Sequence, residues 1–172
     1  EETIDPELTI DRALETYFKK GYSREWINQR LQAIQVRKEL TDEWDARGVQ
    51  KGVEYAILTD EITKAWSGMN TRQYKSLKGL KKENLRDNMT NTELVLNMLA
   101  ELSTKRISEV RNPESFEEHM NVAHQGGSVA RNARMELEAR IGEDVVTPLN
   151  AKDMLELQGD AGTKEGEEDV QE

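Results

Sequence analysis

The chain has 172 residues, 35% of them apolar and 34% charged, with a net charge of -10 and no cysteine. This length suits one domain, and the absence of cysteine excludes disulfides and thiolate metal sites. No apolar run approaches the roughly 18 residues of a membrane span, and there is no signal peptide. We therefore expect a cytoplasmic protein. Because the chain starts with Glu1 instead of Met, we also expect that a part of the natural protein precedes it.

Apolar residues at helical spacing, bounded by capping residues and glycines, predict several helices in the first half of the chain. The expected boundaries are Asp5-Pro6 and Gly21, then Ser23 and Gly48, then Tyr55 and Gly68, then a short segment opened by Asn70 or Thr71. Trp26, Trp44 and Trp66 lie on these helices and are expected to fill the core.

The second half of the chain shows the same kinds of helix-boundary residues. The expected boundaries are a capping box of Thr90 with Glu93, a helix opened by Asn112-Pro113 and broken by Gly126-Gly127, and a helix from Ser128 to Gly142. The stretch Val145-Val146-Thr147-Pro148 reads as extended, and a last short helix is expected after Asn150.

These patterns predict an all-α fold: an irregular multi-helix domain over residues 5–158 with essentially no β-sheet. Eight of the nine aromatic residues lie between Tyr17 and Tyr74, which predicts an aromatic-rich core over 5–80 and an aliphatic helical part over 90–158. The aliphatic part is expected to pack on the first half or on another subunit of a homo-oligomer. Residues 159–172 are Gly, Asp, Glu and Lys for the most part, a composition that predicts a disordered acidic tail.

One basic segment, residues 64–86, stands out in this acidic chain because it holds seven bases and a single acid, Glu83. Lysines and arginines beside a tyrosine are suited to contact phosphates and to stack on a base. A solvated face, or a dock for the chain's own acidic surface or tail, is the structural alternative. The binding residues expected here are Arg72, Tyr74, Lys75, Lys78, Lys81, Lys82 and Arg86.

A second candidate is the segment 124–134, where a glycine pair leads into a Ser-capped helix that carries Arg131 and Arg134. Free N–H groups at a helix N-terminus attract anions, although a plain helix–helix turn fits the same residues. His119 and His124 are five residues apart, which does not suit a metal on one helix face. No nucleophile–base set is visible, so we predict no catalytic residue, no metal and no cofactor.

The stretch LKGLKKENLRDNMTNTELVLNMLAE, residues 77–101, resembles the central motif of the DNA-damage-inducible protein D family. That family overlaps bacterial and prophage antirepressors that carry a Bro-type N-terminal domain. The residues that carry the resemblance are Lys78, Gly79, Leu80, Lys81 and Lys82, then Asp87 and Met89, then Thr92, Glu93 and Leu94. The resemblance implies that the chain is the C-terminal helical region of such a protein, acting in the DNA-damage (SOS) response or in prophage regulation.

These observations together lead us to expect a non-enzymatic regulatory module. Its partner would be a protein of DNA repair or phage regulation, such as the recombinase filament that the resemblance implies. Direct nucleic-acid binding through residues 64–86 is the alternative.

Overall fold

The computed structural model describes the backbone of residues 6–154 and the side chains of residues 11–154. Helices account for almost all of its regular structure. They are α1 (Pro6–Lys19), α2 (Arg24–Ala46), α3 (Val53–Ser67), α4 (Thr71–Leu77), the 3-10 helix η1 (Arg86–Asn88), α5 (Asn91–Arg111) and α6 (Phe116–Ile141). No strand occurs in this part of the chain, so the predicted all-α fold is confirmed. The predicted tail, residues 159–172, lies outside the described residues.

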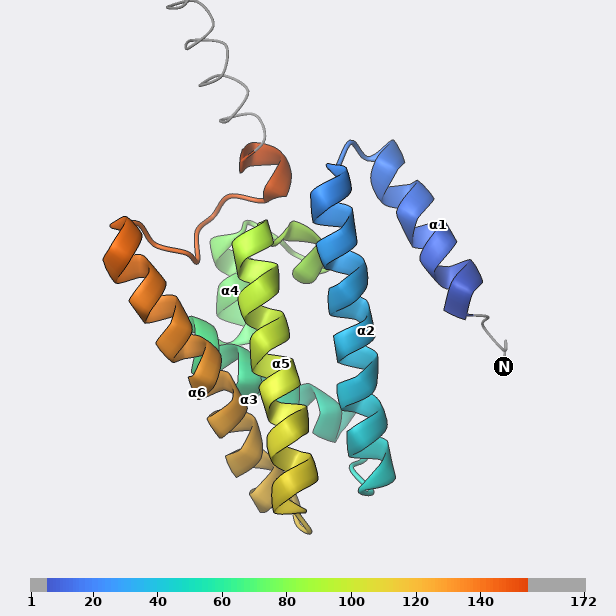
Figure 1. Ribbon diagram of the computed structural model, residues 1–172, viewed down its shortest axis with the longest axis vertical. Helices are drawn as coiled ribbons and strands as arrows, with labels where there is room; N and C mark the ends of the chain where they lie inside the picture. Colours follow the sequence, from blue (N-terminus) through green and yellow to red (C-terminus); the bar gives the residue numbers. More distant parts are fainter. Residues whose placement is uncertain (1–5, 155–172) are drawn as a thin grey trace, which may run out of the picture.

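The long helices form a bundle built around α5. Figure 1 shows α5 between α2 and α6, with α3 and α4 behind it. Helix α5 packs mainly on α6 and α2, and α3 packs on α6. Helix α1 packs mainly against α2 and stands at the side of the bundle.

Several helix starts lie where the sequence predicts them. Ser23 accepts a hydrogen bond from the backbone N–H of Trp26 and caps α2. Asn70 and Thr90 each form a capping box, with Gln73 and Glu93 respectively. These caps satisfy backbone N–H groups that have no partner inside the helix, which explains why local sequence marks them.

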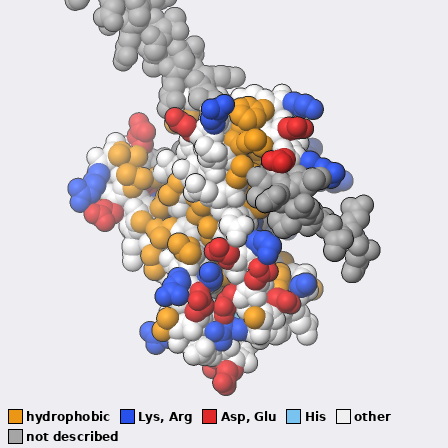
Figure 2. All heavy atoms as spheres, turned by 45° about the vertical axis from the view of Figure 1, so that its right-hand side comes forward, with side chains coloured by type: hydrophobic (Ala, Val, Ile, Leu, Met, Phe, Trp, Pro, Cys, Tyr) orange, Lys and Arg blue, Asp and Glu red, His pale blue; other side chains and the backbone are white. Residues whose placement is uncertain are grey.

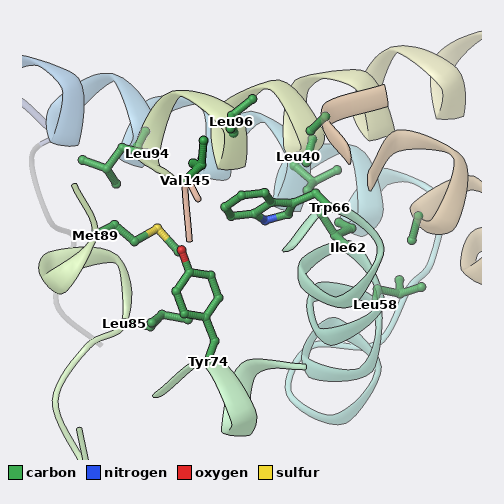
Figure 3. Packing of buried hydrophobic residues seen from close by; sticks show 14 of the residues in the cluster. Leu40, Leu58, Ile62, Trp66, Tyr74, Leu85, Met89, Leu94, Leu96 and Val145 are labelled. Atoms are coloured by element: carbon green, nitrogen blue, oxygen red, sulfur yellow. The ribbon is translucent and has the colours of Figure 1, made fainter. Parts of the chain in front are cut away.

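The three tryptophans are buried as predicted, each at most 1% exposed. The Trp66 indole N–H donates to the side-chain oxygen of Asn97 over 3.2 Å. Figure 3 shows the rings of Trp66 and Tyr74 reaching toward α5, where Leu94 and Leu96 lie. The aromatic-rich residues and the aliphatic helices therefore share one core.

The predicted helix break at Gly126-Gly127 is wrong, because α6 runs through both glycines. A Cβ on Gly126 would lie 2.6 Å from the backbone nitrogen of Thr104 on α5. A Cβ on Gly127 would lie 2.8 Å from the carbonyl oxygen of Ile62 on α3. The glycine pair thus lets three helix backbones approach closely and does not form a turn.

The junction of α5 and α6 also differs from the prediction. Asn112 ends α5 in the left-handed conformation, at φ 51°, and does not open the next helix. Helix α6 begins at Phe116, and the Ser115 side chain caps it by accepting from the backbone N–H of Glu118.

Residues 142–154, which we call the C-terminal strap, return from the end of α6 to the start of α2. Val145 and Ala151 are buried, and the Lys152 ammonium lies 4.7 Å from the centre of the Tyr22 ring. The strap is irregular until residue 151, where a helical turn begins as predicted after Asn150.

Candidate binding surface

The structure corrects the prediction for two residues of the basic segment, Tyr74 and Lys78. Tyr74 is fully buried, and its hydroxyl donates to the Glu93 carboxylate. The Lys78 side chain is 1% exposed and pairs with Glu93 over 2.5 Å. It also donates to the carbonyl oxygen of Leu149 in the strap. Burial lowers the pKa of Lys78, and the Glu93 carboxylate opposes that shift. Both residues join helices and are not available to a partner.

Asp87, another residue of the family motif, holds the segment before α5 against α1 and α2. Its carboxylate accepts from the Tyr17 hydroxyl over 2.7 Å and from Arg30 over 2.8 Å. Burial, together with this hydrogen bond, raises the pKa of Tyr17 to about 12. The Trp26 indole donates to the carbonyl oxygen of Met89, the motif's methionine, over 2.8 Å. Most of the motif therefore stabilises the fold.

Five bases of the segment stay accessible: Lys64, Arg72, Lys75, Lys81 and Lys82. None of them forms an ion pair with a residue that the structure describes. Elsewhere in the described structure many charges form pairs, although exposed bases such as Arg12, Lys51 and Arg131 also have none. Pairs such as Lys38–Asp42 and Arg106–Glu109 lie on α2 and α5, and Figure 2 shows both signs interspersed on one face. The segment 64–86 is set apart by its excess of bases, seven against one acid.

Two of these bases, Arg72 and Lys75, line a hollow of about 650 Å³ between α2, α3 and α4. We call it the basic hollow; its lining residues are Arg37, Ala56, Ile57, Thr59, Asp60, Thr71, Arg72 and Lys75. Three bases face one acid there, and the Asp60 carboxylate accepts from the backbone N–H of Thr71 over 2.8 Å. The half-exposed Ile57 adds an apolar wall.

Arg37 lies at the inner side of this hollow. One guanidinium nitrogen, Nη2, donates to Thr59 over 2.7 Å. The other, Nη1, is buried without a hydrogen-bond partner in the described structure and lies 3.7 Å from Glu101. Burial lowers the pKa of Arg37. A desolvated cation with an unused N–H group favours a nearby anion.

A second, smaller hollow of about 190 Å³ continues from the first and shares Thr59, Thr71 and Lys75 with it. Arg86 lines this second hollow and pairs with Glu101 over 2.7 Å. Its charge is therefore largely compensated, unlike that of Arg72 and Lys75.

The anion site predicted over residues 124–134 is wrong, because an uninterrupted α6 offers no helix N-terminus there. Ser128 donates to the carbonyl oxygen of His124 and caps nothing. Arg134 donates to the carbonyl oxygen of Trp66 and pairs with Glu138, each over 2.8 Å. Arg131 is exposed but does not line the basic hollow.

Two further findings concern the described residues. They contain no group of three or more His, Asp or Glu side chains placed to hold a metal ion. None of their helices combines the length and the apolar character that crossing a membrane requires.

The sequence alone does not mark Arg37, Thr59 and Asp60 as parts of the surface. They lie on α2 and α3, between 12 and 38 positions before the bases of α4. No local pattern marks them, since their role depends on how the helices pack.

Comparison with known proteins gives one match. Residues 21–156 match the family described as the DinD C-terminal domain. No curated protein and no solved structure matches the chain significantly. The family match spans well over half of the 172 residues and includes every helix from α2 to α6. The chain therefore belongs to the DinD C-terminal domain family.

Proposed function

We propose that this DinD C-terminal domain is a non-enzymatic binding module. It engages an acidic surface on a protein of DNA metabolism, for which a recombinase filament is the working example. The observation that carries the proposal is the set of accessible bases around the basic hollow, Arg72 and Lys75 above all, with no ion pair in the described structure. In a chain of net charge -10, such unpaired bases are suited to electrostatic recognition of an acidic partner.

Direct nucleic-acid binding is the second candidate, because the same bases would contact phosphates. The burial of Tyr74 weakens it. Tyr74 and Trp66 are the two aromatic residues between Lys64 and Arg86, and both are fully buried, whereas single-strand binding uses exposed aromatic rings as stacking platforms. An acidic protein surface needs only the charges.

The test compares the wild-type chain with R72A/K75A in binding titrations. The two ligands are a recombinase filament assembled on a single-stranded oligonucleotide and the same oligonucleotide alone. We expect R72A/K75A to weaken filament binding about tenfold or more, because both bases are accessible and unpaired. The matched control is R12A/K20A, which removes two exposed bases of the α1 region.

The outcomes separate the candidates. Protein recognition is supported if the chain binds the filament more tightly than the bare oligonucleotide, and if R72A/K75A weakens this binding whereas R12A/K20A does not. Equal binding to both ligands, with a salt slope that falls by roughly one per lost contact, identifies nucleic-acid binding. Unchanged filament affinity in R72A/K75A rules out this surface.

A further inference from the structure

The basic hollow has an acidic counterpart within the same chain. Residues 155–172, which we call the acidic segment, hold seven acids and one lysine, a net charge of -6. Four of the acids fall within five positions: Glu165, Glu167, Glu168 and Asp169. The accessible bases and the clustered acids have opposite sign, and complementary charges select partners and orient their encounter.

We propose that the acidic segment binds in the basic hollow and competes there with the external partner. The proposal concerns the regulation of the surface assigned above and rests on that assignment. The segment is an acidic peptide, which is the same chemistry as the proposed partner surface. Arg72 and Lys75 would pair with its carboxylates, and the Arg37 guanidinium adds a third positive charge to the lining of the hollow.

The strap fixes where the acidic segment leaves the bundle. Lys78 holds the carbonyl of Leu149, and Lys152 lies over the Tyr22 ring. Met154, the last described residue, lines a hollow together with Trp26 and Thr90. The acidic segment therefore starts beside the N-terminal end of α2.

The exit lies within reach of the basic hollow. Trp26 donates to the carbonyl of Met89, which lines the smaller hollow, and the smaller hollow shares Lys75 with the basic hollow. Along α2, Arg37 lies 13 positions after Arg24, a rise of about 20 Å. Eighteen extended residues reach at most about 60 Å, so the segment is long enough with slack.

Attachment to the same chain favours this occupant. A ligand attached to its receptor through a short linker has an effective concentration in about the millimolar range, so weak individual ion pairs suffice for occupancy. Because the contact is electrostatic and lies at the surface, it should weaken with salt and yield to a tighter partner.

The experiment uses a labelled synthetic peptide of residues 155–172 as the probe and full-length proteins as receptors. In one receptor, E165Q/E167Q/E168Q/D169N, the chain's own segment is neutralised. We expect the peptide to bind this variant about tenfold or more tightly than the wild type, whose own segment competes. Adding R72A/K75A to the variant should abolish peptide binding. The charge-matched control D11N/E15Q/E143Q/D144N removes four exposed acids elsewhere and should behave like the wild type.

Equal peptide affinity for the wild type and the neutralised variant would overturn the proposal, as would binding that survives R72A/K75A or no binding to any receptor. The assay contains no filament and no DNA, so it can fail or succeed independently of the proposed function. Filament titrations on the same proteins complete the separation. Suppose that filament binding depends on Arg72 and Lys75 but does not become tighter when the acidic segment is neutralised. The proposed function would then stand, and the proposed competition would be refuted.

Discussion

Lys78 connects three parts of the molecule: α4, the start of α5 and the strap. Its ammonium pairs with Glu93, donates to Leu149 and lies 5.8 Å from the centre of the Tyr74 ring. Lys81 and Lys82, three and four positions later, are exposed. One lysine run thus contains a buried ion-pair partner and two solvated charges. Charge alone does not distinguish them in the sequence, because burial depends on where Glu93 and the strap lie.

Replacing Lys78 should be far more costly than replacing its neighbours. K78M leaves the Glu93 carboxylate buried without its cation, which costs about 3–5 kcal/mol. K78M/E93Q removes both charges and should recover much of this loss, while K81A/K82A should stay within about 0.5 kcal/mol of the wild type. Urea unfolding of the four proteins measures these differences. A K78M protein as stable as K81A/K82A would contradict the buried pair.

His119 is a second buried ionisable residue, and its Nδ1 atom has no hydrogen-bond partner in the described structure. Burial, reinforced by the Arg47 charge, lowers its pKa, although Glu43, Glu54 and Glu118 oppose the shift. The unfolded chain therefore binds a proton at higher pH than the folded chain does. Stability from this residue is present above the unfolded pKa of about 6.5 and is lost as pH falls below it.

The H119Q variant cannot gain this proton, so it tests the predicted direction in which stability changes with pH. Its free energy of unfolding should fall less than that of the wild type between about pH 7.5 and pH 5. The same comparison for H124Q, at the exposed histidine, serves as the control. A wild-type protein that gains stability relative to H119Q on acidification would show that the buried histidine is charged in the folded state.

At the scale of elements, the sequence predicts what depends on neighbouring residues and misses what depends on distant ones. The caps at Ser23, Asn70 and Thr90 are local hydrogen bonds and are found where expected. The glycine pair of α6 is ambiguous, because glycine serves both turns and close helix contacts. Only Thr104 on α5 and Ile62 on α3, far away in the sequence, decide between them.

The same limit applies to the candidate site. The unusual run of bases is visible in the sequence, and Arg72 and Lys75 lie in the basic hollow. Arg37 joins them from α2, 35 positions before Arg72. Tyr74 and Lys78 turn inward because α4 packs beside the start of α5. Helix packing, which the sequence alone does not reveal, assigns each residue to the core or to the surface.

Alanine at either glycine of α6 tests the close packing. A helix gains about 1 kcal/mol from Gly to Ala, but the added methyl group would meet the backbone of α5 or α3. Overpacking of this kind costs about 1–3 kcal/mol and sometimes more, so G126A and G127A should each lower the melting temperature. N132A, at an exposed position of α6, should leave it unchanged or slightly raised. A stabilised G126A protein would contradict the close contact.

At the scale of the whole molecule, the shared core joins residues that composition divides into two parts. Trp66 donates a hydrogen bond to Asn97, Tyr74 donates a hydrogen bond to Glu93, and α3 packs on α6. Helix α1 is the exception, since it packs mainly on α2 at the edge of the bundle. The aromatic-rich and the aliphatic residues should therefore lose their structure together, with α1 free to fray earlier.

Thermal unfolding followed by two probes tests this cooperativity. Tryptophan fluorescence reports on α2 and α3, which carry all three tryptophans, whereas far-UV circular dichroism reports on every helix. Coincident midpoints are expected, because neither set of helices keeps a closed core without the other. A small early loss of ellipticity is compatible with fraying of α1. The substitution Leu14→Pro, which breaks α1, should remove this early loss of ellipticity and should leave the fluorescence midpoint nearly unchanged. If instead ellipticity were lost in a large separate step while fluorescence stayed native, α5 and α6 would unfold on their own, and the single core described here would be refuted.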